Sequence, residues 1–135
     1  MRKIIFTLLS VLLVSCSVDS DLETQATSNP KWSLVESVGG VAGTTANYEV
    51  NQINWTFNDL DGTLLVEHNV EGISDALDPG TYDFNLQAIN NASFIFINDV
   101  EFGAITINVN RFVIDQNITS DGSTVSDKFE YSFTR

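Results

Sequence analysis

Several residue types that carry structure or chemistry are scarce in this sequence of 135 residues, which has one Cys, one His, one Met and two Pro. A single cysteine excludes an intramolecular disulfide, and one Cys with one His gives poor support for a zinc or other soft-metal site. A domain without disulfides relies on its hydrophobic core for stability. Nine Phe, two Trp and three Tyr supply that core, because aromatic side chains bury the most area per residue.

Positive charge is scarce as well, with six Lys and Arg against 18 Asp and Glu. Four of the six basic residues and all 18 acidic ones follow residue 16, which gives that part of the chain a side-chain charge of −14. Phosphate backbones and anionic head groups repel such a chain, so we expect no nucleic-acid partner. An acidic balance of this kind is also typical of a protein that its net charge keeps soluble.

The first fifteen residues have the order of a secretory signal peptide. Arg2 and Lys3 give a short positive region, an apolar run covers residues 4–14, and small Ser15 precedes Cys16. The apolar run is too short for a comfortable transmembrane helix, which needs about 20 apolar residues. We therefore predict residues 1–15 as a cleaved signal peptide.

Leu13-Val14-Ser15-Cys16 resembles the lipobox of bacterial lipoproteins. The resemblance implies cleavage before Cys16 and attachment of lipid to its thiol, which holds the protein on a membrane because two or more acyl chains anchor stably. The alternative is an ordinary secreted protein with a cysteine at the cleavage point. The position, the flanking residues and the absence of any other cysteine favour the lipid anchor.

Residues 16–30 are predicted to be the lipidated cysteine and a flexible acidic linker. Ser17 stands where such lipoproteins retained at the inner membrane carry Asp, so the resemblance implies an outer-membrane lipoprotein of the cell envelope. The spaced acids of residues 19–23 loosely resemble the signal that exports Bacteroidetes lipoproteins to the cell surface, but a solvated linker explains them equally well. The domain is then expected to face either the periplasm or the outside.

From Lys31 onward apolar and polar residues alternate, the period of two that is typical of half-buried strands. Asn58-Asp59-Leu60-Asp61-Gly62 predicts a β-turn with positive φ at its Asp-Gly, which makes a hairpin of its flanking runs. Gly39 to Gly43 predicts a break, and Pro79-Gly80 closes a longer loop. The predicted strands cover residues 32–38, 53–58, 63–67, 82–87, 93–97, 102–109, 112–114 and 129–134.

About eight short strands without a helix indicate an all-β sandwich or barrel, and their local connections favour an up-and-down antiparallel barrel over residues 31–135. The strand motifs also resemble the lipocalin-like domain of Bacteroidetes lipoproteins, which implies an eight-stranded barrel. No catalytic or ligand residue can be carried over from that family. The motifs that carry the resemblance are Trp32-x-Leu34, Trp55-x-Phe57-Asn58-x-x-Asp61-Gly62-Thr63, Tyr82-x-Phe84 and Tyr131-x-Phe133-x-Arg135.

No constellation of catalytic groups is evident, so we predict that the protein is not an enzyme. His68 is expected at the surface near a strand end, and no serine lies in a nucleophile-elbow motif. The loop acids Glu71, Asp75 and Asp78 offer at most a weak hard-cation site, and we predict no metal and no cofactor.

What remains is a binding or interaction domain on a lipid tether, with a small apolar ligand or an envelope protein as its partner. A structural or accessory role in a cell-surface assembly is the alternative. Phe94 to Ile97 is apolar on both faces, which predicts either a cover over its outer face or a contact surface. Inward aromatic residues more often fill a small barrel than line a cavity. The ligand-lining candidates are Trp32, Trp55, Tyr82, Phe84 and Tyr131.

Overall fold

A computed structural model of the chain describes residues 29–74 and 76–135, which form strands, turns and loops. The predicted signal peptide, Cys16 and most of the predicted linker lie outside these residues. The strands are β1 (Lys31–Gly39), β2 (Thr44–Asn47), β3 (Ile53–Asn58), β4 (Thr63–His68), β5 (Gly80–Ile89), β6 (Ala92–Ile97), β7 (Val100–Ile107), β8 (Arg111–Asp115) and β9 (Phe129–Thr134).

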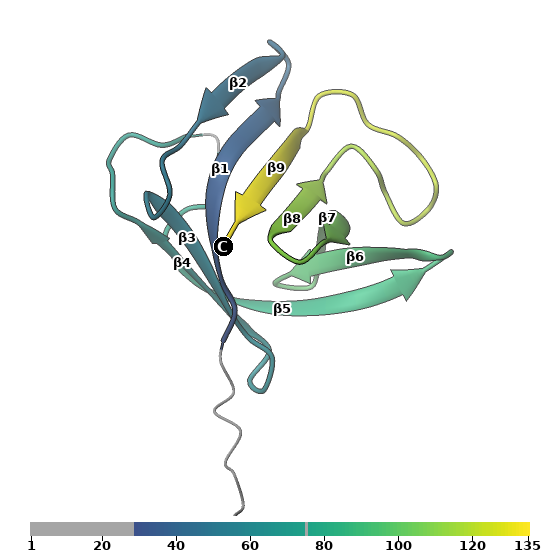
Figure 1. Cartoon of the computed structure of the whole chain (residues 1–135). Helices are drawn as coiled ribbons and strands as arrows, with labels where there is room; N and C mark the ends of the chain where they lie inside the picture. The colour runs from purple at the N-terminus through teal and green to yellow at the C-terminus, as the bar shows by residue number, and fades with distance from the viewer. Residues whose placement is uncertain (1–28, 75) are drawn as a thin grey trace, which may run out of the picture.

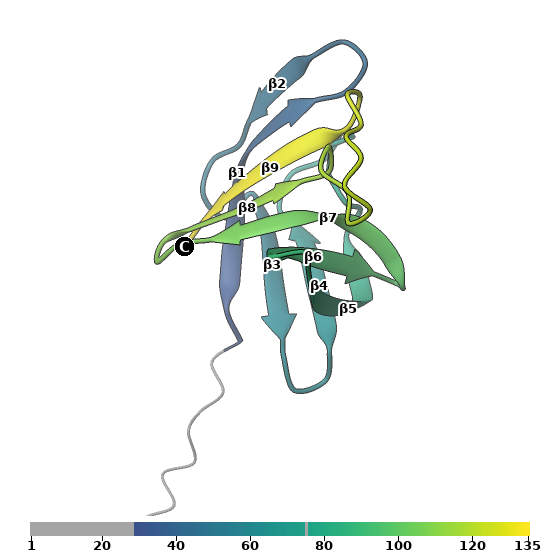
Figure 2. The same cartoon turned by 90° about the vertical axis from the view of Figure 1, so that its right-hand side faces the viewer.

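Eight of these strands close into a barrel. Each pairs antiparallel with its neighbour in the order β1-β3-β4-β5-β6-β7-β8-β9, and β9 pairs back onto β1 between Ser33–Thr134 and Gly39–Phe129. Figures 1 and 2 show these strands curving round a common interior. The prediction of an eight-stranded antiparallel up-and-down barrel is confirmed, and closure leaves no free edge among the eight strands.

The region around Gly39 to Gly43 differs from the prediction of a simple break. The chain turns there with positive φ at Gly40 and Gly43, and returns as β2, which pairs with Glu36–Gly39 of β1. The lower half of β1, Lys31–Ser33, pairs with β3 instead. The short polar sequence of β2 has no apolar alternation, so periodicity gave no signal for it.

The strand predicted over residues 102–109 is shifted. It begins at Val100 and ends at Ile107, and Val109 lies in the following turn with 80% of its surface exposed. A register shift between β6 and β7 lies beside Phe102. The extra residue of such a bulge changes which side chains face inward, and the Phe102 ring lies 5.9 Å from that of Trp55.

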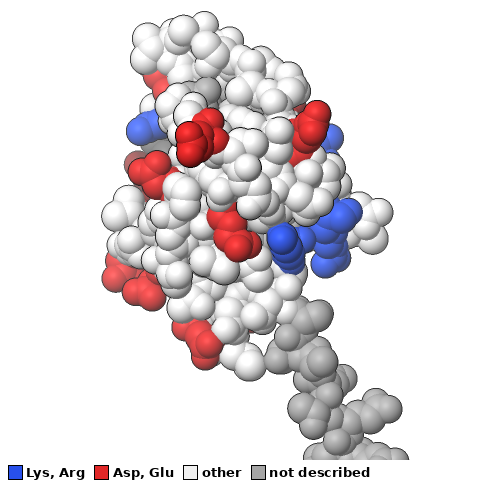
Figure 3. All heavy atoms as spheres, turned by 90° about the vertical axis from the view of Figure 1, so that its left-hand side faces the viewer, with Lys and Arg blue, Asp and Glu red and all other residues white. Residues whose placement is uncertain are grey.

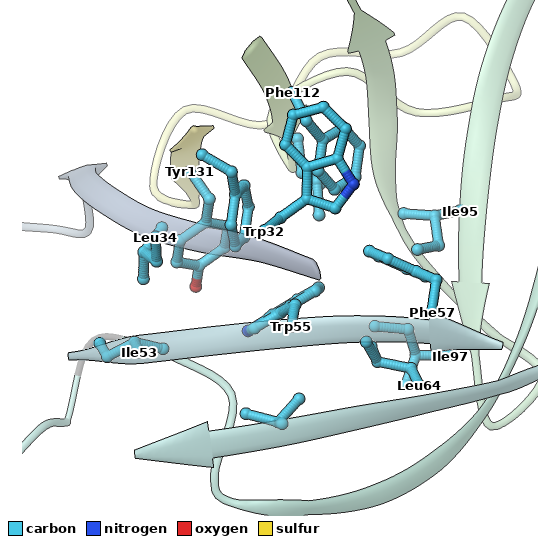
Figure 4. Packing of buried hydrophobic residues seen from close by; sticks show 13 residues of the cluster. Trp32, Leu34, Ile53, Trp55, Phe57, Leu64, Ile95, Ile97, Phe112 and Tyr131 are labelled. Carbon is cyan, nitrogen blue, oxygen red and sulfur yellow. The ribbon is translucent and has the colours of Figure 1, made fainter. Parts of the chain in front are cut away.

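The interior is a packed aromatic and aliphatic core. Trp55 and Phe133 are fully buried, with ring centroids 4.9 Å apart, and Phe133 stacks on Phe112 at 5.2 Å. Figure 4 shows Trp32 of β1 together with Trp55 and Phe57 of β3 converging on this space. The alternation seen in the sequence therefore reports the inward face correctly for these strands.

The run Phe94 to Ile97 is covered more than its sequence suggests. Ile95 and Ile97 belong to the core, while strand alternation turns Phe94 and Phe96 to the other face. Phe94 is nevertheless only 3% exposed and Phe96 is half-buried. The sequence predicted either a covered outer face or a contact surface for this strand, and at Phe94 the outer face is covered.

The meander gives the barrel two distinct ends. The start of β1, the end of β9 and the turns after β3, β5 and β7 meet at one end, which we call the Pro30 end. Figures 1 and 2 show the β3–β4 turn and the start of β1 together at the bottom. The longer loops after β4 and β8 lie at the opposite end, which we call the Asp121 end.

Candidate ligand site at the Pro30 end of the barrel

An apolar cavity opens at the Pro30 end. It has a volume of about 240 Å³ and receives side chains from β1, β3, β5, β7 and β8. Because the strands end here, no further layer of side chains covers the last inward positions. Leu86 of β5 and Ile107 of β7 are therefore 52% and 56% exposed. The lining residues are Pro30, Trp32, Phe57, Asp59, Phe84, Leu86, Ile105, Ile107, Phe112 and Arg135. We call this cavity the barrel mouth.

Aromatic rings make the floor of the barrel mouth. Phe57 lies edge-on to Phe84 with centroids 5.0 Å apart and edge-on to Phe112 at 5.8 Å. Trp32 lies 5.6 Å from Phe112. Edge-to-face and tilted pairs of this kind hold rings in fixed positions. The floor is therefore preformed for an apolar group.

Two charged residues of opposite sign stand at the rim. The Arg135 guanidinium lies 4.7 Å from the centre of the Trp32 ring, and its Nε and Nη2 donate to the Val109 carbonyl oxygen at 3.2 and 3.0 Å. These contacts fix Arg135 between β9 and the β7–β8 turn. Asp59 enters the rim from the β3–β4 turn.

The structure brings two of the five predicted ligand-lining residues together in the barrel mouth, Trp32 and Phe84. Trp55 and Tyr131 lie in the packed core, 0% and 5% exposed. Tyr82 is half-buried against the core, and its hydroxyl donates to the Asp78 carbonyl oxygen at 2.8 Å.

Several lining residues could not be identified from the sequence. Alternation shows that a residue faces the interior, but it does not show how far along the barrel axis the residue lies. Ile105, Ile107 and Phe112 follow the alternation, so their inward direction was readable. Their place at the open end follows from strand pairing, which joins Ile107 to Phe112 across β7 and β8. Arg135 gave no signal, because its role depends on the ring of Trp32, more than 100 residues away.

A second, more polar cavity of about 360 Å³ lies at the Asp121 end, between β7 and the loop before β9. Glu101 accepts hydrogen bonds from the Ser120 hydroxyl and, at 2.8 Å, from its backbone N–H. Asp121 accepts from the Thr119 hydroxyl at 2.6 Å and the Ser123 N–H at 2.8 Å. These bonds, that from Thr119 foremost, lower the pKa of Asp121 to about 2. The two acidic side chains of this cavity, Glu101 and Asp121, therefore accept hydrogen bonds that stabilise the loop before β9.

The other chemically interesting residues have local partners. His68 is half-buried rather than fully at the surface, and its Nε2 donates to the Leu77 carbonyl oxygen at 2.9 Å. Gly62 has a φ of 65°, as its Asp-Gly turn predicts, and the Asn58 side chain accepts from the N–H groups of Leu60 and Asp61. Within residues 29–74 and 76–135, no group of three or more His, Cys, Asp or Glu is placed to hold a metal ion.

Comparisons with protein-family models, with curated proteins and with solved structures found no match to this chain. In the part of the chain that the structure describes, no helix has the length and apolar character to cross a membrane. The fold class, an eight-stranded antiparallel barrel, therefore rests on the strand pairing itself.

Proposed function

We propose that this chain is a membrane-anchored lipoprotein of the lipocalin-like type, with a non-enzymatic binding domain and its lipid on Cys16. We place it in the cell envelope, at the outer membrane, and assign the barrel mouth to the apolar part of a small ligand. The observation that carries the binding proposal is a cavity with an aromatic floor whose wall residues Leu86 and Ile107 remain half exposed. A ligand there would remove that apolar surface from water.

The volume limits what the barrel mouth accepts. Drug-sized ligands occupy pockets of roughly 300–1,000 Å³, whereas the barrel mouth has about 240 Å³. A single ring or a chain of about six carbons therefore fits, and any larger molecule must extend into solvent. At about 0.8 kcal/mol for each buried CH₂, six carbons contribute at most about 5 kcal/mol, so we expect a dissociation constant on the order of 1 mM or above.

Sodium hexanoate is a suitable probe, because its five apolar carbons fit this volume and its carboxylate keeps it in water. We expect the lipoprotein, in zwitterionic micelles, to show saturable amide NMR shifts confined to the strands around Trp32 and Ile107. Ile107→Glu places a charge in the lining and should weaken binding at least about tenfold. Val41→Glu is the control, because Val41 follows β1 at the opposite end of the barrel, is 89% exposed and does not line the cavity.

Shifts that do not saturate, or equal effects of the two variants, would contradict the assignment of the barrel mouth. A partner protein would then be the better proposal for the binding domain. The alternative role in a surface assembly rests on the apolar outer face of β6. Since Phe94 is 3% exposed and Phe96 half-buried, this face offers little free apolar area, and we prefer the small ligand.

A further inference from the structure

The charges of the described barrel are divided unequally between its two ends. Three of the four described basic residues lie at the Pro30 end: Lys31 starts β1, Arg111 starts β8 and Arg135 follows β9. All three side chains are exposed. Two acids, Asp59 and Asp61, share this end through the β3–β4 turn.

The Asp121 end carries the opposite balance. Lys128 is its one basic residue among those described, against ten acids. Glu36 and Asp83, the other two described acids, lie further inside their strands, β1 and β5, and are counted with neither end. The ten acids are Glu49, Glu67, Glu71, Asp78, Asp99, Glu101, Asp115, Asp121, Asp127 and Glu130. The Pro30 end therefore has a net side-chain charge of +1 and the Asp121 end one of −9.

Exposed apolar side chains project from the Pro30 end as well. Leu60 at the tip of the β3–β4 turn is 74% exposed, and Val109 in the β7–β8 turn is 80% exposed. Apolar exposure alone does not distinguish the ends, because Val41 beyond β1 is 89% exposed. The combination of apolar turn tips with basic residues is what sets the Pro30 end apart. Figure 3 shows the largest group of Lys and Arg atoms beside the start of the described chain, with smaller groups higher on that face, and Asp and Glu atoms scattered over the whole face.

We propose that the Pro30 end lies against an anionic phospholipid surface, so that the barrel mouth opens toward the membrane. This inference rests on the proposed lipid anchor at Cys16. The described chain begins at the same end, so an anchor on Cys16 brings the Pro30 end nearest to the bilayer. Fourteen residues separate Cys16 from Lys31, a span of at most about 50 Å. A span of this length permits other orientations, and charge selects among them.

The net charge of the chain does not prevent this contact. Charges are screened over about 8 Å at physiological ionic strength, whereas a nine-residue strand such as β1 spans roughly 30 Å. The surface therefore acts mainly on the end that faces it. The linker acids Asp19, Asp21 and Glu23 adjoin the anchor in sequence in either orientation, so they do not favour one orientation over the other. That end presents three cations to lipid phosphates, and Leu60 and Val109 to the interface between head groups and acyl chains. The reversed orientation would press ten acids against the same surface.

The test compares fluorescent probes at the two ends of the lipoprotein inserted in vesicles. Asn110→Cys lies in the β7–β8 turn and Ser123→Cys in the turn of the Asp121 end; both positions are exposed and uncharged. With Cys16 lipidated, an environment-sensitive thiol reagent labels only the new cysteine. In phosphatidylcholine vesicles with about one-third phosphatidylglycerol, we expect a blue shift and quenching by brominated lipid for the Asn110 probe alone. Pure phosphatidylcholine or high salt should abolish both effects.

Charge variants test whether the basic residues of the Pro30 end cause its contact with the membrane. Lys31→Gln with Arg111→Gln should lower the ratio of membrane-bound to free barrel about 25-fold, since each basic residue near an anionic surface contributes about a fivefold change. Neither residue lines the barrel mouth. Lys128→Gln removes one positive charge from the Asp121 end, where each charge lost from the Pro30 end would give about a fivefold change, and should change the ratio less than about twofold.

The outcomes separate this inference from the proposal on which it rests. An intact mass without lipid on Cys16 would overturn the anchor, and the orientation with it. The orientation alone would be overturned if the protein is lipidated but the probe at position 110 shows no blue shift or quenching in anionic vesicles. It would also be overturned if the two probes respond alike. Hexanoate binding in micelles is independent of both results and tests the barrel mouth separately.

Discussion

Gly103 of β7 provides a sharp test of the barrel's packing. A Cβ atom on Gly103 would lie 2.7 Å from the Asp115 carbonyl oxygen and 3.0 Å from Ile114 Cγ2, both on β8. Real side chains do not tolerate such a distance to a backbone oxygen, so Gly103→Ala must push β7 and β8 apart where Ala104 pairs with Asp115. Overpacking of a core in this way costs about 1–3 kcal/mol of unfolding free energy.

Gly80→Ala is the matched control, because the same methyl group meets only ordinary contacts there. Its nearest atoms belong to the Tyr82 ring, at 3.5 Å or more. Neither glycine has a positive φ, so alanine fits both backbone conformations. Replacing glycine where the conformation suits alanine stabilises a protein by about 0.4–1 kcal/mol. The two variants should therefore differ by about 1.5–4 kcal/mol.

Urea denaturation followed by tryptophan fluorescence measures this difference, because Trp55 and Trp32 are 0% and 5% exposed and report on the barrel interior. Thermal unfolding gives a second reading, with about 4–8 °C for each kcal/mol in a domain of this size. Equal stability of the two variants would refute the close approach of β7 and β8 at Gly103.

Two further predictions concern polar groups. Ser33 Oγ donates to Asn54 Oδ1 at 2.9 Å and accepts from the Asn51 N–H at 3.2 Å. Ser33→Ala should therefore lower the free energy of unfolding by about 1–3 kcal/mol. In a double-mutant cycle with Asn54→Ala, additive losses of unfolding free energy would contradict a shared hydrogen-bond network. Asp121 has a folded pKa of about 2, below its ordinary 3.8, so its stabilising contribution is complete above pH 3.8 and is lost as the pH falls toward 2. NMR titration should show its midpoint near pH 2, and Thr119→Val should move that midpoint upward, whereas an unchanged midpoint would show that the Thr119 hydroxyl is not the main cause.

Much of the fold was predictable because strand alternation and turn chemistry are local. The inward positions Ile53, Trp55 and Phe57 follow directly from period two, and the turn at Gly62 from its Asp-Gly pair. β2 was missed because its residues pair with β1 without burying an apolar face. The bulge beside Phe102 was missed as well, since a register shift depends on how two strands meet rather than on either sequence.

The site was less predictable than the fold. Of the inward aromatic residues, Trp32 and Phe84 line the barrel mouth, while Trp55 and Tyr131 fill the core. All four obey the same alternation, so the sequence contains no information on which of them meets open space. That depends on where each strand ends relative to its neighbours, which the pairing register decides.

For this protein, local sequence alone determined the class of fold and the inward face of most strands, because each depends on neighbouring residues; the anchor at Cys16 stays a prediction from the same kind of local pattern. Only the tertiary structure decided that the aromatic floor opens at the Pro30 end and that the described charges divide into one weakly basic and one strongly acidic end. These properties arise from residues far apart in the chain. A closed antiparallel barrel brings its strand termini together at two ends, and composition alone does not record which charges meet at each.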